Sequence, residues 1–193
     1  MEREAILAAV RNMLTEHRFR HTLGVAETAK QLAARFGADV EKAELAGILH
    51  DCAKYWPEDE MKAIIRQEPE LPDDLLDYDK ELWHAPVGSI LIQREFGIQD
   101  PDIIAAVRYH TSGRVGMTVL EKVICLADYI EPNRNFPGVE DIRALAEQDL
   151  DQALATALGG TIRFLIQQHK RVYPLTLLAY NDLLAPQNGQ KEP

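Results

Sequence analysis

The chain has 193 residues, of which 46% are hydrophobic and 27% charged. This composition is typical of a globular domain and excludes a disordered or collagen-like chain. Its 31 acidic and 21 basic side chains give a net charge of −10, which repels a nucleic-acid backbone, so we expect no nucleic-acid partner. The length is that of one domain, which we place at residues 1–185, followed by a polar C-terminal tail at 186–193.

The sequence contains no obvious targeting or membrane segment. The first residues include acids and no long apolar run, and no window approaches ~20 apolar residues, so we expect neither a signal peptide nor a membrane partner. Two cysteines, Cys52 and Cys125, lie in apolar stretches, which implies no disulfide framework and fits a reducing cytoplasm. The oligomeric state stays open, with a homodimer as the common default.

Apolar residues recur at helical spacing nearly throughout the chain, which predicts an all-α fold, a bundle of about eight to ten helices. The first helix contains the apolar positions of residues 6–13. A second is expected over about 20–36, and a third begins after the N-cap Asp39. Pro57 and the three acids that follow it indicate a fourth helix, because acids stabilise the positive end of a helix.

The second half of the chain continues the helical pattern. Residues 68–79 hold two prolines and many acids, so we expect a loop with one turn of helix. Further helices are expected over about 87–96, 101–110, 118–130, 139–147, 150–170 and 175–184. The helix over 118–130 opens with the capping box of Thr118 and Glu121, and the Glu131-Pro132 step should end it.

Six side chains of metal-ligating type occur near helix ends or on inward faces: His21, His50, Asp51, His84, His110 and Asp128. Asp128 shares a helix face with Leu120 and Ile124, and a buried aspartate is costly unless it is paired or metal-bound. A single histidine on an apolar face is more often a hydrogen-bonded core residue. The complete set, rather than any one member, therefore predicts an N/O metal site. His17 and His169 lie in polar stretches and should face solvent.

The order His, His-Asp, His, His, Asp resembles the HD-domain metal phosphohydrolase superfamily. The segments that carry the resemblance begin at Phe19, Ile48, Trp83, Arg108 and Leu126. Along nearly its whole length, the chain is similar to the small bacterial HD-domain symmetrical bis(5′-nucleosyl)-tetraphosphatases. The resemblance implies an HD-domain helical bundle, iron as the metal, and hydrolysis of diadenosine tetraphosphate to two ADP.

The expected ligands of a first metal ion are His21, His50, Asp51 and Asp128. A second ion would be held by Asp51, His84 and His110, because a carboxylate can bridge two ions ~3.5–4 Å apart. With a single ion, His84 and His110 would instead hold phosphate or protonate the leaving ADP. Four imidazoles favour iron, manganese, cobalt or zinc over magnesium.

A tetraphosphate chain needs local cations even in an acidic protein. Lys54 follows Asp51 by three residues, which makes it a catalytic and phosphate-binding candidate; a solvated helix-end cation is the alternative. At least one of Arg18 and Arg20 should lie on the surface without a role in the site. The other substrate-binding candidates are Arg18, His84, His110, Thr111, Arg134, Lys170, Arg171 and Tyr173, the last of which would stack on adenine if the resemblance holds.

Three other functions compete with this interpretation. An HD phosphohydrolase could act on another nucleotide, such as a nucleoside mono- or diphosphate or an alarmone, and its products would differ. A catalytically inactive nucleotide-binding module should lack metal ligands, whereas this chain keeps all six. A purely structural helical domain ranks last, because the cost of placing Asp128 on an apolar face would then serve no function.

Overall fold

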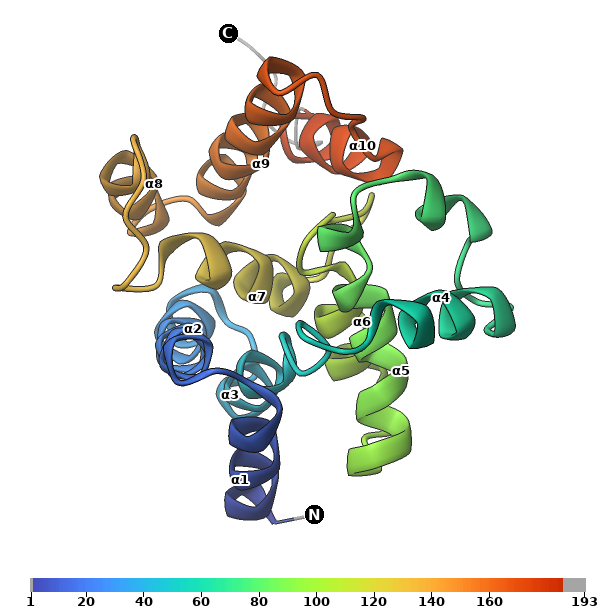
Figure 1. Cartoon of the computed structure of the whole chain (residues 1–193). Coiled ribbons are helices and arrows are strands. Elements are labelled where there is room, and N and C mark those ends of the chain that lie inside the picture. Colours follow the sequence, from blue (N-terminus) through green and yellow to red (C-terminus); the bar gives the residue numbers. More distant parts are fainter. Residues whose placement is uncertain (1, 186–193) are drawn as a thin grey trace, which may run out of the picture.

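The computed structural model describes residues 2–185 (Figure 1). This part contains ten α-helices, two short 3-10 helices and no strand, which confirms the predicted all-α bundle. The α-helices are α1 Arg3–Met13, α2 Glu16–Phe36, α3 Val40–Leu49, α4 Glu58–Gln67, α5 His84–Phe96, α6 Pro101–Tyr109, α7 Val119–Ile130, α8 Val139–Ala146, α9 Leu150–Gln167 and α10 Pro174–Leu183. The 3-10 helices are η1 Asp73–Asp77 and η2 Lys80–Leu82. The expected polar tail at 186–193 lies outside the described residues.

Helix α7 lies at the centre of the bundle (Figure 1). It packs against α2, α3, α6, α8 and α9, and most of its residues are buried. The predicted capping box is present, since the Thr118 hydroxyl accepts from the N–H of Glu121 and the Glu121 side chain accepts from the N–H of Thr118. The capping box therefore fixes where the central helix begins. Asp128 lies in the last turn of this helix.

The described residues form two hydrophobic cores. The main core contains buried residues of α1, α2, α3, α6, α7 and α9. A smaller second core lies among α4, the 3-10 helices and the start of α5, and includes Met61, Ile65, Leu75, Trp83 and Tyr173. Helix α5 contributes to both cores, so it joins the segment over 58–83 to the rest of the bundle.

Two helices begin earlier than the sequence pattern predicts. Helix α2 starts at Glu16 rather than near residue 20, because the Thr15 hydroxyl accepts from the N–H of Arg18 and caps an additional turn. Helix α5 starts at His84 rather than near 87, because η2 leads directly into it and Pro86 is tolerated in a first turn. Arg18 and His84 therefore lie on helices.

Gly47 allows α3 to lie directly against α2. A Cβ atom at this position would be 2.7 Å from Cα and 3.1 Å from the backbone nitrogen of Ala26. Backbone atoms cannot move aside as a side-chain tip can, so only glycine fits this contact. Because α2 carries His21 and α3 leads into His50, the contact also brings these two histidines together.

We expect Gly47→Ala to destabilise the fold by about 1–3 kcal/mol, the usual cost of inserting a methyl group into a close-packed core. Urea unfolding followed by circular dichroism measures the change. Gly160→Ala is the matched control, because a Cβ at Gly160 in α9 meets nothing within 4 Å. That variant should be more stable by roughly 0.5–1 kcal/mol. Equal stability of Gly47→Ala and the wild type would contradict the close helix contact.

Candidate metal centre

The structure brings all six predicted ligand residues together where α2, α3, α5, α6 and α7 meet. His21 lies on α2, His50 and Asp51 follow α3, His84 is the first residue of α5, His110 follows α6, and Asp128 lies on α7. Their side-chain atoms form three overlapping groups, each with its ligand atoms within 4.8 Å of one another: His21–His50–Asp51, His50–His110–Asp128 and Asp51–His84–His110.

Three of the four histidines are oriented by nearby backbone. The Nδ1–H of each donates to the carbonyl oxygen three residues earlier, at 2.7 Å in every case: His50 to Gly47, His84 to Glu81 and His110 to Val107. These carbonyls are available because the last carbonyls of a helix have no partner within it. A carbonyl oxygen only accepts, so Nδ1 carries the proton and the Nε2 lone pair faces the centre of the cluster.

His21 reaches the same orientation by a different route. Its Nδ1–H donates to Glu131 Oε1 at 3.0 Å. Its Nε2 lies 3.0 Å from Asp128 Oδ1 and 3.6 Å from Asp51 Oδ2. All four imidazoles therefore turn Nε2 inward.

The two aspartates place negative charge among these nitrogens. Asp51 Oδ1 lies 3.1 Å from His84 Nε2, and Asp51 Oδ2 lies 3.2 Å from His50 Nε2. Burial opposes ionisation of Asp51, yet His50 and His84 hold its pKa well below the ordinary value. Burial likewise opposes ionisation of Asp128, while the adjacent His21 ring and the Arg134 guanidinium hold its pKa well below the usual range. Both carboxylates are therefore anionic at neutral pH.

The donor set fits a divalent metal ion. Among the described residues, Nε2 of His21, Nε2 of His50 and both oxygens of Asp51 are buried without a well-aligned hydrogen bond, although charged or ionisable groups lie close to each of them. The Nε2 atoms of His84 and His110 lie 3.1 Å apart, and burial together with the neighbouring histidines holds the pKa of His110 well below its usual range. Facing lone pairs and buried carboxylates are stabilised by a shared cation, and imidazole with carboxylate is a donor set of borderline divalent metals.

Two arginines add positive charge to the carboxylates. Arg18 Nε lies 2.5 Å from Asp51 Oδ2. Arg134 donates to the backbone carbonyl of Asp128 at 2.7 Å and also pairs with its carboxylate. Arg20 is exposed, so it is the surface member of the pair that flanks His21.

A family model of the HD domain matches residues 18–133, which is more than half of the chain. This chain belongs to the HD-domain family. All six clustered residues lie within the matched stretch. Membership implies a divalent metal, in agreement with the donor set.

Similar proteins extend over nearly the whole chain. A symmetrical bis(5′-nucleosyl)-tetraphosphatase of Bacillus subtilis is 58% identical over 185 residues, which cover 96% of this chain and 99% of that protein. Another from Halalkalibacterium halodurans is 50% identical and covers 97% of this chain and 100% of its own. The fold also matches a crystal structure of a predicted HD superfamily hydrolase involved in NAD metabolism from Clostridium acetobutylicum, with TM-score 0.92, 39% identity, and coverage of 97% and 99% of the two chains.

Two further observations concern the cysteines and the hydrophobicity of the helices. Both cysteines, Cys52 and Cys125, are free and buried, as the absence of a disulfide framework predicts. Within residues 2–185, no helix has the length and apolar character that a membrane span requires.

The remaining predicted cations contact residues in the segment over 77–81. Lys54 Nζ lies 2.8 Å from Glu81 Oε2 rather than on a ligand carboxylate. Lys170 Nζ pairs with Asp79 at 2.6 Å. Arg171 donates to the backbone carbonyl of residue 77 at 3.3 Å. Lys170 and Arg171 therefore join the chain before α10 to the segment that contains the 3-10 helices.

Tyr173 is buried rather than exposed as a stacking surface would be. Its ring packs edge-on against Tyr78 with centroids 4.9 Å apart, as part of the second core. Burial also raises the pKa of its hydroxyl to about 12. With Arg108 and Tyr109, Tyr173 lines a cavity of about 140 Å³. Thr111 adjoins His110, and its buried hydroxyl has no hydrogen-bond partner among the described residues.

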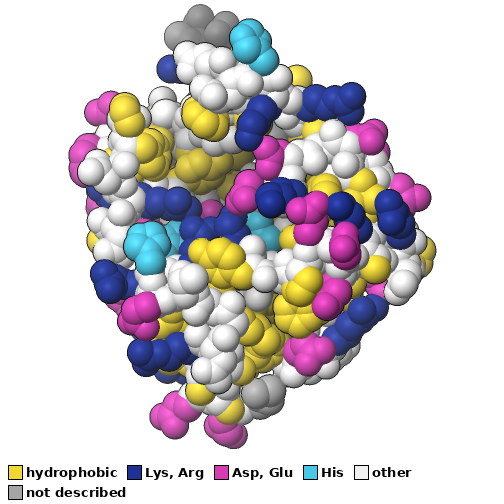
Figure 2. All heavy atoms as spheres, in the orientation of Figure 1, with side chains coloured by type: hydrophobic (Ala, Val, Ile, Leu, Met, Phe, Trp, Pro, Cys, Tyr) yellow, Lys and Arg dark blue, Asp and Glu magenta, His cyan; other side chains and the backbone are white. Residues whose placement is uncertain are grey.

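The surface shows where a charged ligand can approach. Figure 2 shows basic side chains across the middle of one face, with histidine side chains visible between them.

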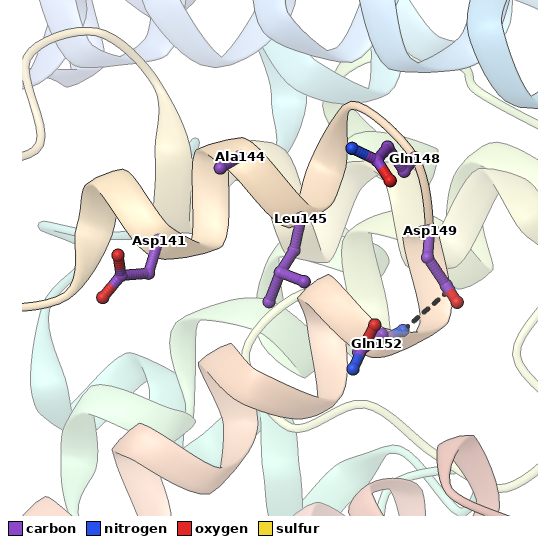
Figure 3. A pocket seen from close by; sticks show the side chains of 6 residues that line it. All are labelled: Asp141, Ala144, Leu145, Gln148, Asp149 and Gln152. Carbon is purple, nitrogen blue, oxygen red and sulfur yellow. Dashed lines mark hydrogen bonds between the residues drawn. The ribbon is translucent and has the colours of Figure 1, made fainter.

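A larger pocket of about 660 Å³ lies elsewhere, between α8 and the start of α9 (Figure 3). Its lining residues are Asp141, Ala144, Leu145, Gln148, Asp149 and Gln152. This pocket has acidic, amide and apolar side chains and no basic residue in its lining, so it does not suit a polyphosphate.

Glu131 is the site residue that the sequence analysis missed. It was interpreted only as the end of the central helix before Pro132, yet its side chain is 1% exposed and contacts His21. One signal was available, since Glu131 follows the apolar residues of α7 directly and lies three residues after Asp128. This spacing places the two carboxylates on the same side of a helix end.

Proposed function

We propose that this HD-domain protein hydrolyses bis(5′-nucleosyl) tetraphosphates symmetrically and converts diadenosine tetraphosphate to two ADP. The observation that carries the proposal is the inward convergence of four Nε2 atoms and two anionic carboxylates. It occurs in a chain 58% identical to a symmetrical bis(5′-nucleosyl)-tetraphosphatase over 96% of its length. The nucleotide partner follows from the same similarity.

The proposed ligands of one divalent ion are His21, His50, Asp51 and Asp128, and those of a second are Asp51, His84 and His110. We favour iron, with manganese, cobalt or zinc as alternatives, because imidazole ligands suit these metals better than magnesium. When bound, the metal supplies a water of lowered pKa and a Lewis acid for a phosphate oxygen. Both are needed to hydrolyse a phosphoanhydride at neutral pH.

The residues of the chain position the tetraphosphate so that the central anhydride reacts. Symmetric cleavage requires water to add to one of the two inner phosphorus atoms and the bond from that atom to the central bridging oxygen to break, which leaves ADP on each side. The two halves of the substrate therefore need cations on both sides of the cluster. Arg134 provides one at the Asp128 side, and Lys54 provides another beside Glu81, whose carbonyl orients His84.

The function is tested by product analysis. We expect the purified protein, loaded with Fe²⁺ without oxygen, to convert diadenosine tetraphosphate to ADP alone, as measured by anion-exchange chromatography. EDTA treatment should remove the activity, and Fe²⁺ should restore it. AMP with ATP as products would contradict symmetric cleavage. Absence of turnover by the metal-loaded protein would contradict the proposed substrate and direct the search to other nucleotides.

Asp51→Ala should lower kcat/KM by more than ~10²-fold. Loss of a partner outside the first ligand shell typically costs ~10–100-fold, and Asp51 contributes oxygens to both proposed ion positions. Metal content should fall in parallel, as measured by elemental analysis. Asp59→Ala is the matched control, because that side chain is fully exposed on α4 and its removal should leave both values unchanged. Full activity of Asp51→Ala in metal-replete buffer would refute the ligand assignment.

Lys54→Ala should raise KM by about 5–30-fold and change kcat less, because a charge-assisted contact to phosphate contributes on the order of 1–2 kcal/mol. Steady-state kinetics with diadenosine tetraphosphate separates the two parameters. Lys62→Ala removes a comparable lysine–glutamate pair, Lys62 to Glu58 at 2.7 Å, away from the cluster. If Lys54→Ala behaves like that control, Lys54 serves only as the partner of Glu81.

A further inference from the structure

Glu131 is a buried carboxylate that lies directly behind His21. Its Oε1 accepts from His21 Nδ1 at 3.0 Å. Its Oε2 accepts from both the backbone N–H and the side-chain amide of Asn133, each at 2.8 Å. Three N–H donors thus converge on the two oxygens, and the side chain is 1% exposed. A buried group with this many donors is held in one orientation.

His21 needs an acceptor from outside its own helix. It lies inside α2, which runs from Glu16 to Phe36, where backbone carbonyls are used by helical hydrogen bonds. His50, His84 and His110 follow helix ends or a 3-10 turn and use a carbonyl three residues earlier. Only for His21 among the four does a side chain 110 residues away provide the acceptor. This acceptor is a carboxylate, whereas the other three are neutral carbonyls.

Gly24 provides a second, independent observation. A Cβ atom at this position would lie 2.4 Å from Glu131 Oε2 and 3.2 Å from Glu131 Cδ. Glycine inside a helix costs roughly 0.5–1 kcal/mol relative to alanine. The chain therefore carries a helix-weakening residue one turn after His21, where the Glu131 carboxylate approaches α2.

We propose that Glu131 is a positioning residue for the metal ligand His21 and strengthens metal binding at the His21–Asp128 side of the cluster. The carboxylate fixes the proton on Nδ1, so that the Nε2 lone pair faces Asp128 and Asp51. Its charge also increases the electron density on the imidazole, as outer carboxylates do for ligating histidines. The proposal rests on the metal dependence of the proposed function. It gives Glu131 no contact with the substrate.

The test is titration of the metal-free protein with Co²⁺, followed by its visible absorption, which reports both affinity and ligand geometry. We expect Glu131→Gln to weaken Co²⁺ binding by about 10–100-fold and to alter the absorption bands. Glutamine keeps one acceptor for His21 but removes the charge and turns an amide N–H₂ toward the Asn133 donors. Gly24→Ala should also weaken Co²⁺ binding, although Glu131 itself is unchanged, because the added methyl group displaces the Glu131 carboxylate.

Glu121→Gln is the matched control. Glu121 is also fully buried, and it lies in the first turn of α7. Its Oε1 pairs with Arg114 Nε, 2.6 Å away, and neither residue belongs to the cluster. This variant should unfold at a lower temperature and keep its Co²⁺ dissociation constant within twofold of the wild type.

Three outcomes would overturn the proposal. One is unchanged Co²⁺ affinity and absorption in Glu131→Gln. Another is an equal loss of affinity in Glu131→Gln and Glu121→Gln, which would indicate general damage to the core. The third is a wild-type protein that binds no Co²⁺. That result would also refute the metal dependence of the proposed function, whereas the first two leave it intact.

Discussion

The buried carboxylate of Asp51 is the constraint on which the rest of this structure depends. A carboxylate removed from water is costly unless opposite charge and hydrogen-bond donors surround it. Here Arg18 provides positive charge at Oδ2, and the Nε2 atoms of His50 and His84, which would share a metal ion with the carboxylate, lie 3.2 and 3.1 Å from its two oxygens. Helix α3 ends at Leu49, so that His50 and Asp51 follow it directly. The ends of α3 and α6, the start of α5 and the last turn of α7 thus meet around this charge in the middle of a hydrophobic bundle.

The orientation of the histidines shows which parts of the cluster are local and which are not. His50 and His110 take their Nδ1 acceptors from the last turns of their own helices, so a short stretch of sequence suffices to orient each ring. His21 depends on Glu131, which is distant in sequence. Formation of the complete ligand set thus requires α2 to dock on the end of α7. The glycines at 24 and 47 each permit a close approach that this part of the bundle needs.

The same distinction explains how much could be predicted from the sequence. Helix existence and most boundaries follow from apolar spacing and caps, such as the Thr118 capping box, and these are signals within a few residues. The set of ligand residues predicted a metal site because each one lies near a helix end or on an inward face, and their order indicated the HD-domain family by resemblance. The early start of α2 was missed because the Thr15 cap precedes the apolar pattern. The burial of Tyr173 could not be predicted, because it depends on Tyr78, far away in the sequence.

The charges of the cluster explain how a protein with a net charge of −10 can hold a polyphosphate. Arg18 faces the buried carboxylate of Asp51, and Arg134 faces the half-buried carboxylate of Asp128, so much of their charge balances these two groups. Lys54 differs, because its partner Glu81 has a side chain that is 66% exposed. An exposed carboxylate regains water when its partner leaves, whereas a buried one is left without compensation. Replacing the carboxylate partner by a phosphate oxygen therefore costs little free energy at Lys54 and much more at Arg18. The acidic surface sets the long-range repulsion, and selectivity for a polyanion must come from such exchangeable cations beside the cluster.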